Sequence, residues 1–98
     1  MVEHVVLLKP KATVTDAAIA DLWSGINGLA KVIPGISEIQ VGLNGSPEGL
    51  DRGFTLGFIV RFVDEAARDA YLPHPAHQAV VPKVLAVADE VLVFDLAH

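Results

Sequence analysis

Hydrophobic positions along the chain repeat with two different periods, and the change of period separates strands from helices. Residues 2–9 form a run rich in β-branched residues and leucine, which is typical of a strand. Residues 36–43 and 54–63 alternate from one side to the other, and residues 90–96 form a last apolar run. These four segments are the predicted strands.

The first predicted helix lies between the first two strands. Thr15 is placed to cap it, and Pro34-Gly35 is placed to stop it. Between these marks the apolar residues follow the i, i+3, i+4 spacing of one helical stripe. They are Ile19, Leu22, Trp23, Ile26, Leu29, Ala30 and Ile33.

A second helical region is predicted between the third and fourth strands. Asp64 is placed to cap a short helix that runs to Tyr71. Pro75 suits the first turn of a second piece, and Pro82 must either kink that piece or begin a third.

The resulting order, β-α-β-β-α-β, predicts an α+β ferredoxin-like unit with an antiparallel sheet, formed by residues 1–98 as one domain. Two helices cover only one face of such a sheet, yet both faces are apolar, with Val6 and Leu8 on one side of the first strand and Val5 and Leu7 on the other. An exposed apolar face of this size is unusual in a monomer. We therefore expect a homodimer packed sheet to sheet, with a large ligand or a different partner as the alternative.

Composition and charge exclude several classes of protein. Hydrophobic residues make up 52% of the chain, which excludes disorder, and the lack of cysteine excludes disulfides, thiolate metal sites and cysteine nucleophiles. Seven basic against twelve acidic residues give a net charge of -5, which argues against a nucleic-acid partner. The sequence has neither an apolar run long enough for a membrane span nor a signal-peptide pattern, so we expect a cytoplasmic protein that does not enter membranes.

Two histidines and the only tyrosine are the candidates for chemistry. His77 follows Pro75 on the same helical stripe as Val80, and His4 alternates with apolar residues of the first strand. If these histidines and Tyr71 share a cavity, a neutral imidazole can take a proton while the phenol donates to a developing oxyanion. The alternative is that each histidine is a core residue with both ring nitrogens hydrogen-bonded.

Two further features are weaker signals. His74 and His77 have the i, i+3 spacing of a metal pair, but the sequence offers no obvious third ligand. Asp95 lies among apolar residues of the last strand, where it can orient a histidine, pair with Arg61 or remain an edge carboxylate.

Four segments together resemble the stress-responsive dimeric α/β-barrel (A/B barrel, Dabb) family: residues 3–9, 32–35, 69–77 and 91–95. The most specific piece is the block in which Tyr71 is followed, two residues on, by His-Pro-x-His. The resemblance implies a ferredoxin-like protomer whose sheet joins that of a second chain in one barrel.

The family includes plant stress proteins, many bacterial members without an assigned reaction, and olivetolic acid cyclase. By resemblance to that cyclase, His77 would be the general base, Tyr71 would assist it and His4 would line the pocket, while a second pocket tyrosine is replaced here by Ile26.

Some plant relatives also hold Mg²⁺ on backbone carbonyls. The matching positions in this chain are Ala30, Ile33 and Ile36.

We therefore expect a small dimeric protein with an apolar pocket for a hydrophobic small molecule. If catalytic, it would act as a cyclase or isomerase on a hydrophobic carbonyl compound with no redox cofactor. The alternatives are a non-catalytic stress-response or ligand-binding dimer, and a haem- or quinone-handling monooxygenase, because such enzymes share the barrel.

Overall fold

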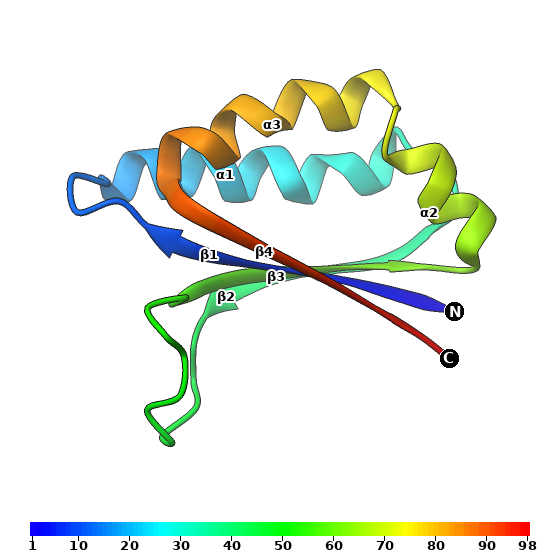
Figure 1. Ribbon diagram of the computed structural model, residues 1–98. Helices are drawn as coiled ribbons and strands as arrows, with labels where there is room; N and C mark the ends of the chain where they lie inside the picture. Colours follow the sequence, from blue (N-terminus) through cyan, green and yellow to red (C-terminus); the bar gives the residue numbers. More distant parts are fainter.

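A four-stranded antiparallel sheet forms one layer of the molecule, and the helices form a second layer on one of its faces (Figure 1). The computed structural model describes residues 1–98. The elements are β1 (Val2–Pro10), α1 (Asp16–Gly28), the 3₁₀ helix η1 (Leu29–Lys31), β2 (Ile36–Leu43), β3 (Leu56–Phe62), α2 (Glu65–Tyr71), α3 (Pro75–Val87) and β4 (Ala88–Ala97). None of the helices combines the length and apolar composition that a membrane crossing requires.

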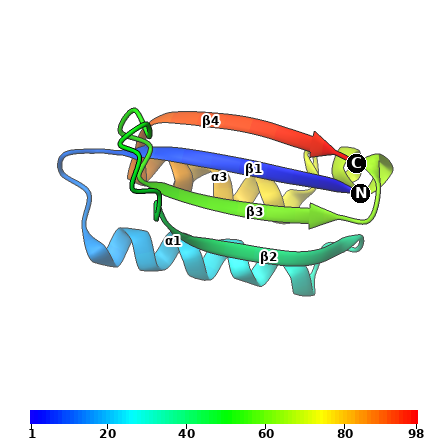
Figure 2. The ribbon, with the colours of Figure 1, turned by 90° about the horizontal axis from the view of Figure 1, so that it is seen from below.

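The sheet has the strand order β2-β3-β1-β4, so the first and third strands lie in the middle (Figure 2). All three neighbouring pairs are antiparallel, and the registers place Leu7 opposite both Gly57 and Leu92. The predicted ferredoxin-like β-α-β-β-α-β architecture is confirmed.

The helices begin where the capping residues predict. The Thr15 side chain accepts a hydrogen bond from the Ala18 amide, and the Asp64 side chain accepts one from the Ala67 amide. The first helix is shorter than the stripe suggests, because it tightens into η1 after Gly28. Pro82 lies inside α3 and does not begin a new helix.

Glycines allow close packing at two places in the helical layer. A Cβ atom on Gly25 would lie 3.2 Å from the Lys83 side chain, so this glycine faces α3 rather than solvent. Gly35, which has a φ of +88°, would bring a Cβ atom within 2.6 Å of the Cβ of Ala67. The turn before β2 can therefore pass close to α2 only with glycine at position 35.

The core fills the space between the helices and the sheet. Alternate residues of β1 and β3, among them Val2, Leu8, Val60 and Phe62, are buried against Leu22 and other helix residues. This is the arrangement that the alternation in the sequence predicts for one face of the sheet.

The opposite face of the sheet, here called the outer face, has no helix over it (Figure 1). The loop between β2 and β3 hangs from this side, away from the helices (Figure 1). Leu92 and Phe94 on this face are 49% and 61% exposed. The predicted apolar second face is therefore present and uncovered in a single chain.

Candidate active site in the helix-side cavity

A cavity of about 320 Å³ lies between the sheet and α3, on the helix side. Most of its wall is apolar and includes Ile26, Val80 and Val93. His4, Tyr71 and His77 also line it. The three candidate residues, which are far apart in the sequence, thus share one cavity, and Ile26 contributes an apolar wall to it.

His77 lies in the first turn of α3, where Pro75 starts the helix. Its Nδ1 lies 2.8 Å from the carbonyl oxygen of Leu72. A carbonyl only accepts hydrogen bonds, so Nδ1 must carry the hydrogen in the neutral ring. The lone pair is then on Nε2, which is the tautomer a general base requires.

Tyr71 is the last residue of α2 and is only 1% exposed. Its ring centroid lies 4.3 Å from that of His77, 4.9 Å from Phe62 and 5.8 Å from His4. Burial raises the pKa of Tyr71 to about 12, so its hydroxyl remains a hydrogen-bond donor at neutral pH. No side-chain polar atom in the molecule is both sealed from solvent and unpartnered.

His4 is oriented by a charged pair at the end of the sheet. Its Nδ1 lies 2.6 Å from Asp95 Oδ1, and Arg68 Nη1 donates to Asp95 Oδ2 at 2.7 Å. Burial alone would raise the pKa of Asp95, but hydrogen bonds from Arg68 and His4 outweigh it and hold that pKa below its ordinary value. The carboxylate therefore accepts from Nδ1–H of His4, which leaves the lone pair of the neutral ring on Nε2.

Of the partners expected for Asp95, the histidine is correct and Arg61 is wrong. Arg61 lies on the outer face, where it binds Glu3 and Glu38, and the sheet separates it from Asp95. The actual cationic partner, Arg68 on α2, was missed. The one available signal was its position one helical turn before Tyr71.

The structure gives no support to a metal site at His74 and His77. The Nδ1 atom of His74 caps α3 by accepting from the Ala76 amide at 3.0 Å, and Nδ1 of His77 is bound to Leu72. The molecule has no group of three or more histidine, cysteine or acidic side chains able to hold a metal ion.

The magnesium positions Ala30, Ile33 and Ile36 follow one another around the turn from η1 into β2. They offer carbonyl oxygens without a carboxylate, and Lys31 adds a positive charge to the same turn. Backbone carbonyl oxygens are donors that hard cations accept, and a magnesium ion at this turn stays a prediction.

A family model described as "Stress responsive A/B Barrel Domain" (Dabb) matches residues 2–97. This chain belongs to that family. The membership predicted from the Tyr71–His77 block and the strand sequences is thus confirmed.

Several Dabb relatives and structural neighbours have been characterised or solved. Olivetolic acid cyclase from Cannabis sativa is 24% identical over 94 residues, which cover 96% of this chain and 93% of the cyclase. A stress-response A/B barrel domain-containing protein from Arabidopsis thaliana is 38% identical over 69 residues, 70% of this chain. That match spans only 26% of the length of the Arabidopsis protein.

Solved structures show the same fold. A dimeric ferredoxin-like protein of unknown function from Jannaschia sp. is 34% identical, with a TM-score of 0.87 over 99% of this chain and 98% of that one. A hydroxynitrile lyase from Passiflora edulis, 20% identical, has a TM-score of 0.84 over 97% and 90% of the two chains. The Dabb fold thus occurs in a cyclase, in a lyase and in proteins without a known reaction.

Proposed function

We propose that this Dabb protein is a homodimer whose helix-side cavity binds a hydrophobic carbonyl compound and moves a proton on it without a redox cofactor. The observation that carries the proposal is the contact between His77 Nδ1 and the Leu72 carbonyl, because it leaves a proton-accepting Nε2 on a residue that lines the cavity. The homodimer is supported by the uncovered outer face and by neighbours described as dimeric.

The proposed reaction begins at a C–H bond next to the carbonyl group. His77 Nε2 takes the proton, and the electron pair of that bond passes to the carbonyl oxygen as an enolate. Tyr71 donates a hydrogen bond to this oxygen, and its raised pKa keeps the proton on the phenol. In a cyclisation, the carbanion attacks a second carbonyl within the ligand, and the alkoxide that forms takes the proton back from His77 Nε2. In an isomerisation, His77 Nε2 returns the proton to a different atom of the enolate.

His4 serves as a second polar anchor in this proposal. Asp95 and Arg68 hold its ring, so that Nε2 can accept a hydrogen bond from a ligand hydroxyl. The remaining wall is apolar and binds the hydrophobic part of the ligand.

The test is hydrogen–deuterium exchange at the acidic carbon of a medium-chain 1,3-diketone in D₂O, followed by NMR. We expect the native protein to accelerate exchange above the buffer rate, and His77→Gln to lower that acceleration by about 10² or more. Tyr71→Phe should also slow exchange. His74→Asn is the matched control, because it removes a neighbouring histidine but keeps a capping side chain.

Binding of the diketone without accelerated exchange would contradict catalysis and favour the ligand-binding alternative. Exchange that survives His77→Gln unchanged would contradict the role of His77.

A further inference from the structure

The helix-side cavity contains polar groups but no charged ones. Its wall consists of apolar residues together with His4, Tyr71 and His77, and no lysine, arginine, aspartate or glutamate lines it. A carboxylate or phosphate group that entered would lose its hydration without meeting a cation, which is costly. We therefore expect the part of a ligand that lies inside the cavity to be uncharged.

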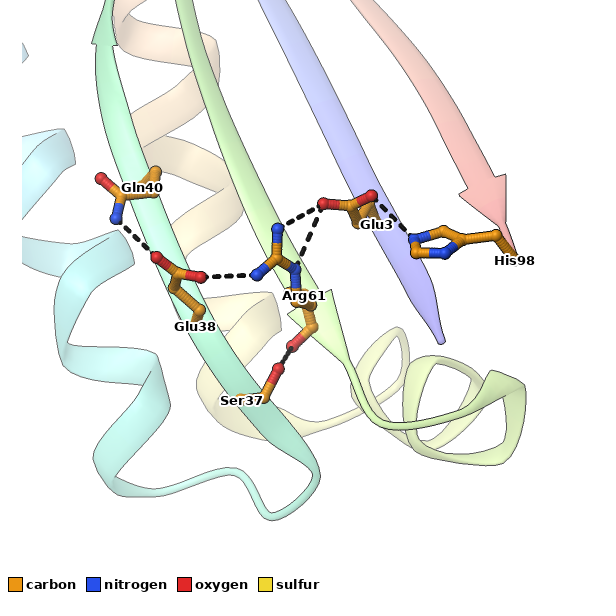
Figure 3. Close-up of polar contacts among 6 residues, drawn as sticks. All are labelled: Glu3, Ser37, Glu38, Gln40, Arg61 and His98. Atoms are coloured by element: carbon orange, nitrogen blue, oxygen red, sulfur yellow. Dashed lines mark hydrogen bonds and ion pairs between the residues drawn. The ribbon is translucent and has the colours of Figure 1, made fainter.

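The two arginines at this end of the sheet are not available to an anionic ligand. Arg61 lies on the outer face, where two glutamates bind it (Figure 3). Arg68 does not line the cavity, and it binds Asp69 and Asp95. Because each guanidinium group already has two carboxylate partners, neither arginine offers a free positive charge to a ligand.

The three polar side chains of the cavity have defined hydrogen-bonding roles. No protein group binds the Nε2 atom of either histidine or the hydroxyl of Tyr71, although every sealed side-chain polar atom has a partner. These three atoms are therefore open to the space of the cavity. The phenol can donate to a ligand. Both neutral imidazoles accept through Nε2, because their Nδ1 hydrogens are bound to Asp95 and to the Leu72 carbonyl.

A ligand that satisfies these groups needs a hydrogen-bond donor as well as a carbonyl oxygen. In the proposed reaction the carbonyl oxygen accepts from Tyr71, and the acidic C–H bond faces His77. This leaves Nε2 of His4, a residue that is only 6% exposed, as an acceptor. A ligand hydroxyl can donate to it, whereas a ligand without a donor would cover it and leave it unpaired.

Asp95 decides whether His4 accepts or donates. Its Oδ1 lies 2.6 Å from His4 Nδ1, and its Oδ2 accepts from Arg68 Nη1 at 2.7 Å. A carboxylate has only acceptors, so it requires the hydrogen of the neutral imidazole on Nδ1 and leaves the lone pair on Nε2.

We propose that the cavity selects neutral hydroxycarbonyl compounds, and that Asp95, held by Arg68, is the positioning residue that sets this selectivity by keeping His4 Nε2 an acceptor. The inference rests on the function proposed above and names the class of ligand within it. β-Hydroxyketones belong to this class, and so does the enol form of a diketone, because each carries one hydroxyl and one carbonyl. Carboxylic acids of the same shape do not belong to it.

Calorimetric titration of the native protein with three ligands of one size tests the selectivity. They are 4-hydroxyoctan-2-one, its O-methyl ether, and 3-hydroxyheptanoate, in which a carboxylate replaces the acetyl group. At neutral pH we expect the hydroxyketone to bind about tenfold or more tightly than the ether, because the ether leaves His4 Nε2 without a donor. The carboxylate should bind about a hundredfold more weakly than the hydroxyketone, because it must lose its hydration or take up a proton.

Asp95→Asn should reverse the role of His4. Arg68 only donates, so it binds the oxygen of the new amide, and the amide nitrogen then donates to His4 Nδ1. The ring hydrogen moves to Nε2, and the preference for the hydroxyketone over the ether should disappear. The matched control is Glu38→Gln, which also turns an arginine-bound carboxylate into an amide but lies on the outer face (Figure 3). The control should keep the native preference.

Nitrogen-15 NMR of the histidine rings reads the same change without a ligand. The hydrogen of the His4 ring should be on Nδ1 in the native protein and on Nε2 in Asp95→Asn. The native spectrum is sufficient even if the variant does not fold. A native His4 ring with its hydrogen on Nε2, or with hydrogens on both nitrogens, would overturn the role of Asp95.

The outcomes separate the selectivity from the proposed reaction. A native preference for the hydroxyketone without accelerated hydrogen–deuterium exchange of the diketone would support the selectivity and contradict catalysis. Equal binding of hydroxyketone and ether would overturn the need for a donor, even where exchange is accelerated. A preference that persists in Asp95→Asn would overturn the role of Asp95. Binding of the carboxylate as tightly as the hydroxyketone, or binding of none of the three ligands, would overturn the proposed ligand class.

Discussion

Replacing Asp95 with alanine tests whether the Arg68–Asp95–His4 group stabilises the fold at the end of the cavity. His4 is only 6% exposed, so the substitution leaves its Nδ1–H without an acceptor in a buried place. An unsatisfied buried donor costs about 1–3 kcal/mol. Arg68 keeps its contact with Asp69, so the loss of its ion pair with Asp95 costs less, about 0.5 kcal/mol. We expect a total loss of about 1.5–3.5 kcal/mol in the free energy of unfolding.

Thermal and urea unfolding at fixed protein concentration measure this loss. In a domain of this size, about 1.5–3.5 kcal/mol corresponds to a fall of about 6–28 °C in Tm. The matched control is Glu90→Ala on the same strand, because the Glu90 pair with Lys9 is exposed and should change stability by less than about 0.5 kcal/mol. A loss in Asp95→Ala no larger than in the control would refute the structural role of the group.

The stability that Asp95 contributes should also depend on pH in one direction. The pKa of Asp95 is lowered in the folded state, so its contribution is fully present above its unfolded value of about 3.9. That contribution is lost as the pH falls through the folded pKa. The stability difference between native protein and Asp95→Ala should therefore narrow below about pH 4.

Two other measurements test the structure directly. In chemical denaturation, Gly35→Ala should destabilise the fold by more than about 1 kcal/mol, because position 35 combines a positive φ with a 2.6 Å approach to Ala67. Gly28→Ala should be neutral or stabilising by up to about 1 kcal/mol, because a Cβ atom there meets nothing within 4 Å. Equal effects of the two substitutions would contradict this geometry. Tyr71 is the only tyrosine, so its near-ultraviolet absorbance should show no tyrosinate until the pH approaches 12, and stability should fall as the pH rises above 10, the ordinary phenol value. Ionisation near pH 10 in the folded protein would show that the ring is not buried.

The sequence predicted the strands and their two faces because period-two alternation depends only on neighbours along the chain. Val5 and Val6 lie on opposite faces in the structure, as expected. The helix starts at Thr15 and Asp64 were also predictable, because capping is a local interaction.

Contacts between distant elements were harder to predict. Arg68 reaches Asp95 only because of the angle at which α2 crosses the end of the sheet, and no local pattern encodes that angle. Gly25 lies outside the apolar stripe of its helix, yet it faces α3, which packs there and widens the buried arc. Asp95 and Arg61 were considered as partners before the register was known, and the register places them on opposite faces.

The edge strand β4 connects the two surfaces discussed above. Val93 lines the cavity on one side of the strand, and the next residue, Phe94, projects from the other side. A ligand in the cavity and a second copy on the outer face would therefore act on the same stretch of backbone. By thermodynamic linkage, if the ligand raises the affinity between the subunits by some factor, then subunit association raises the affinity for the ligand by the same factor.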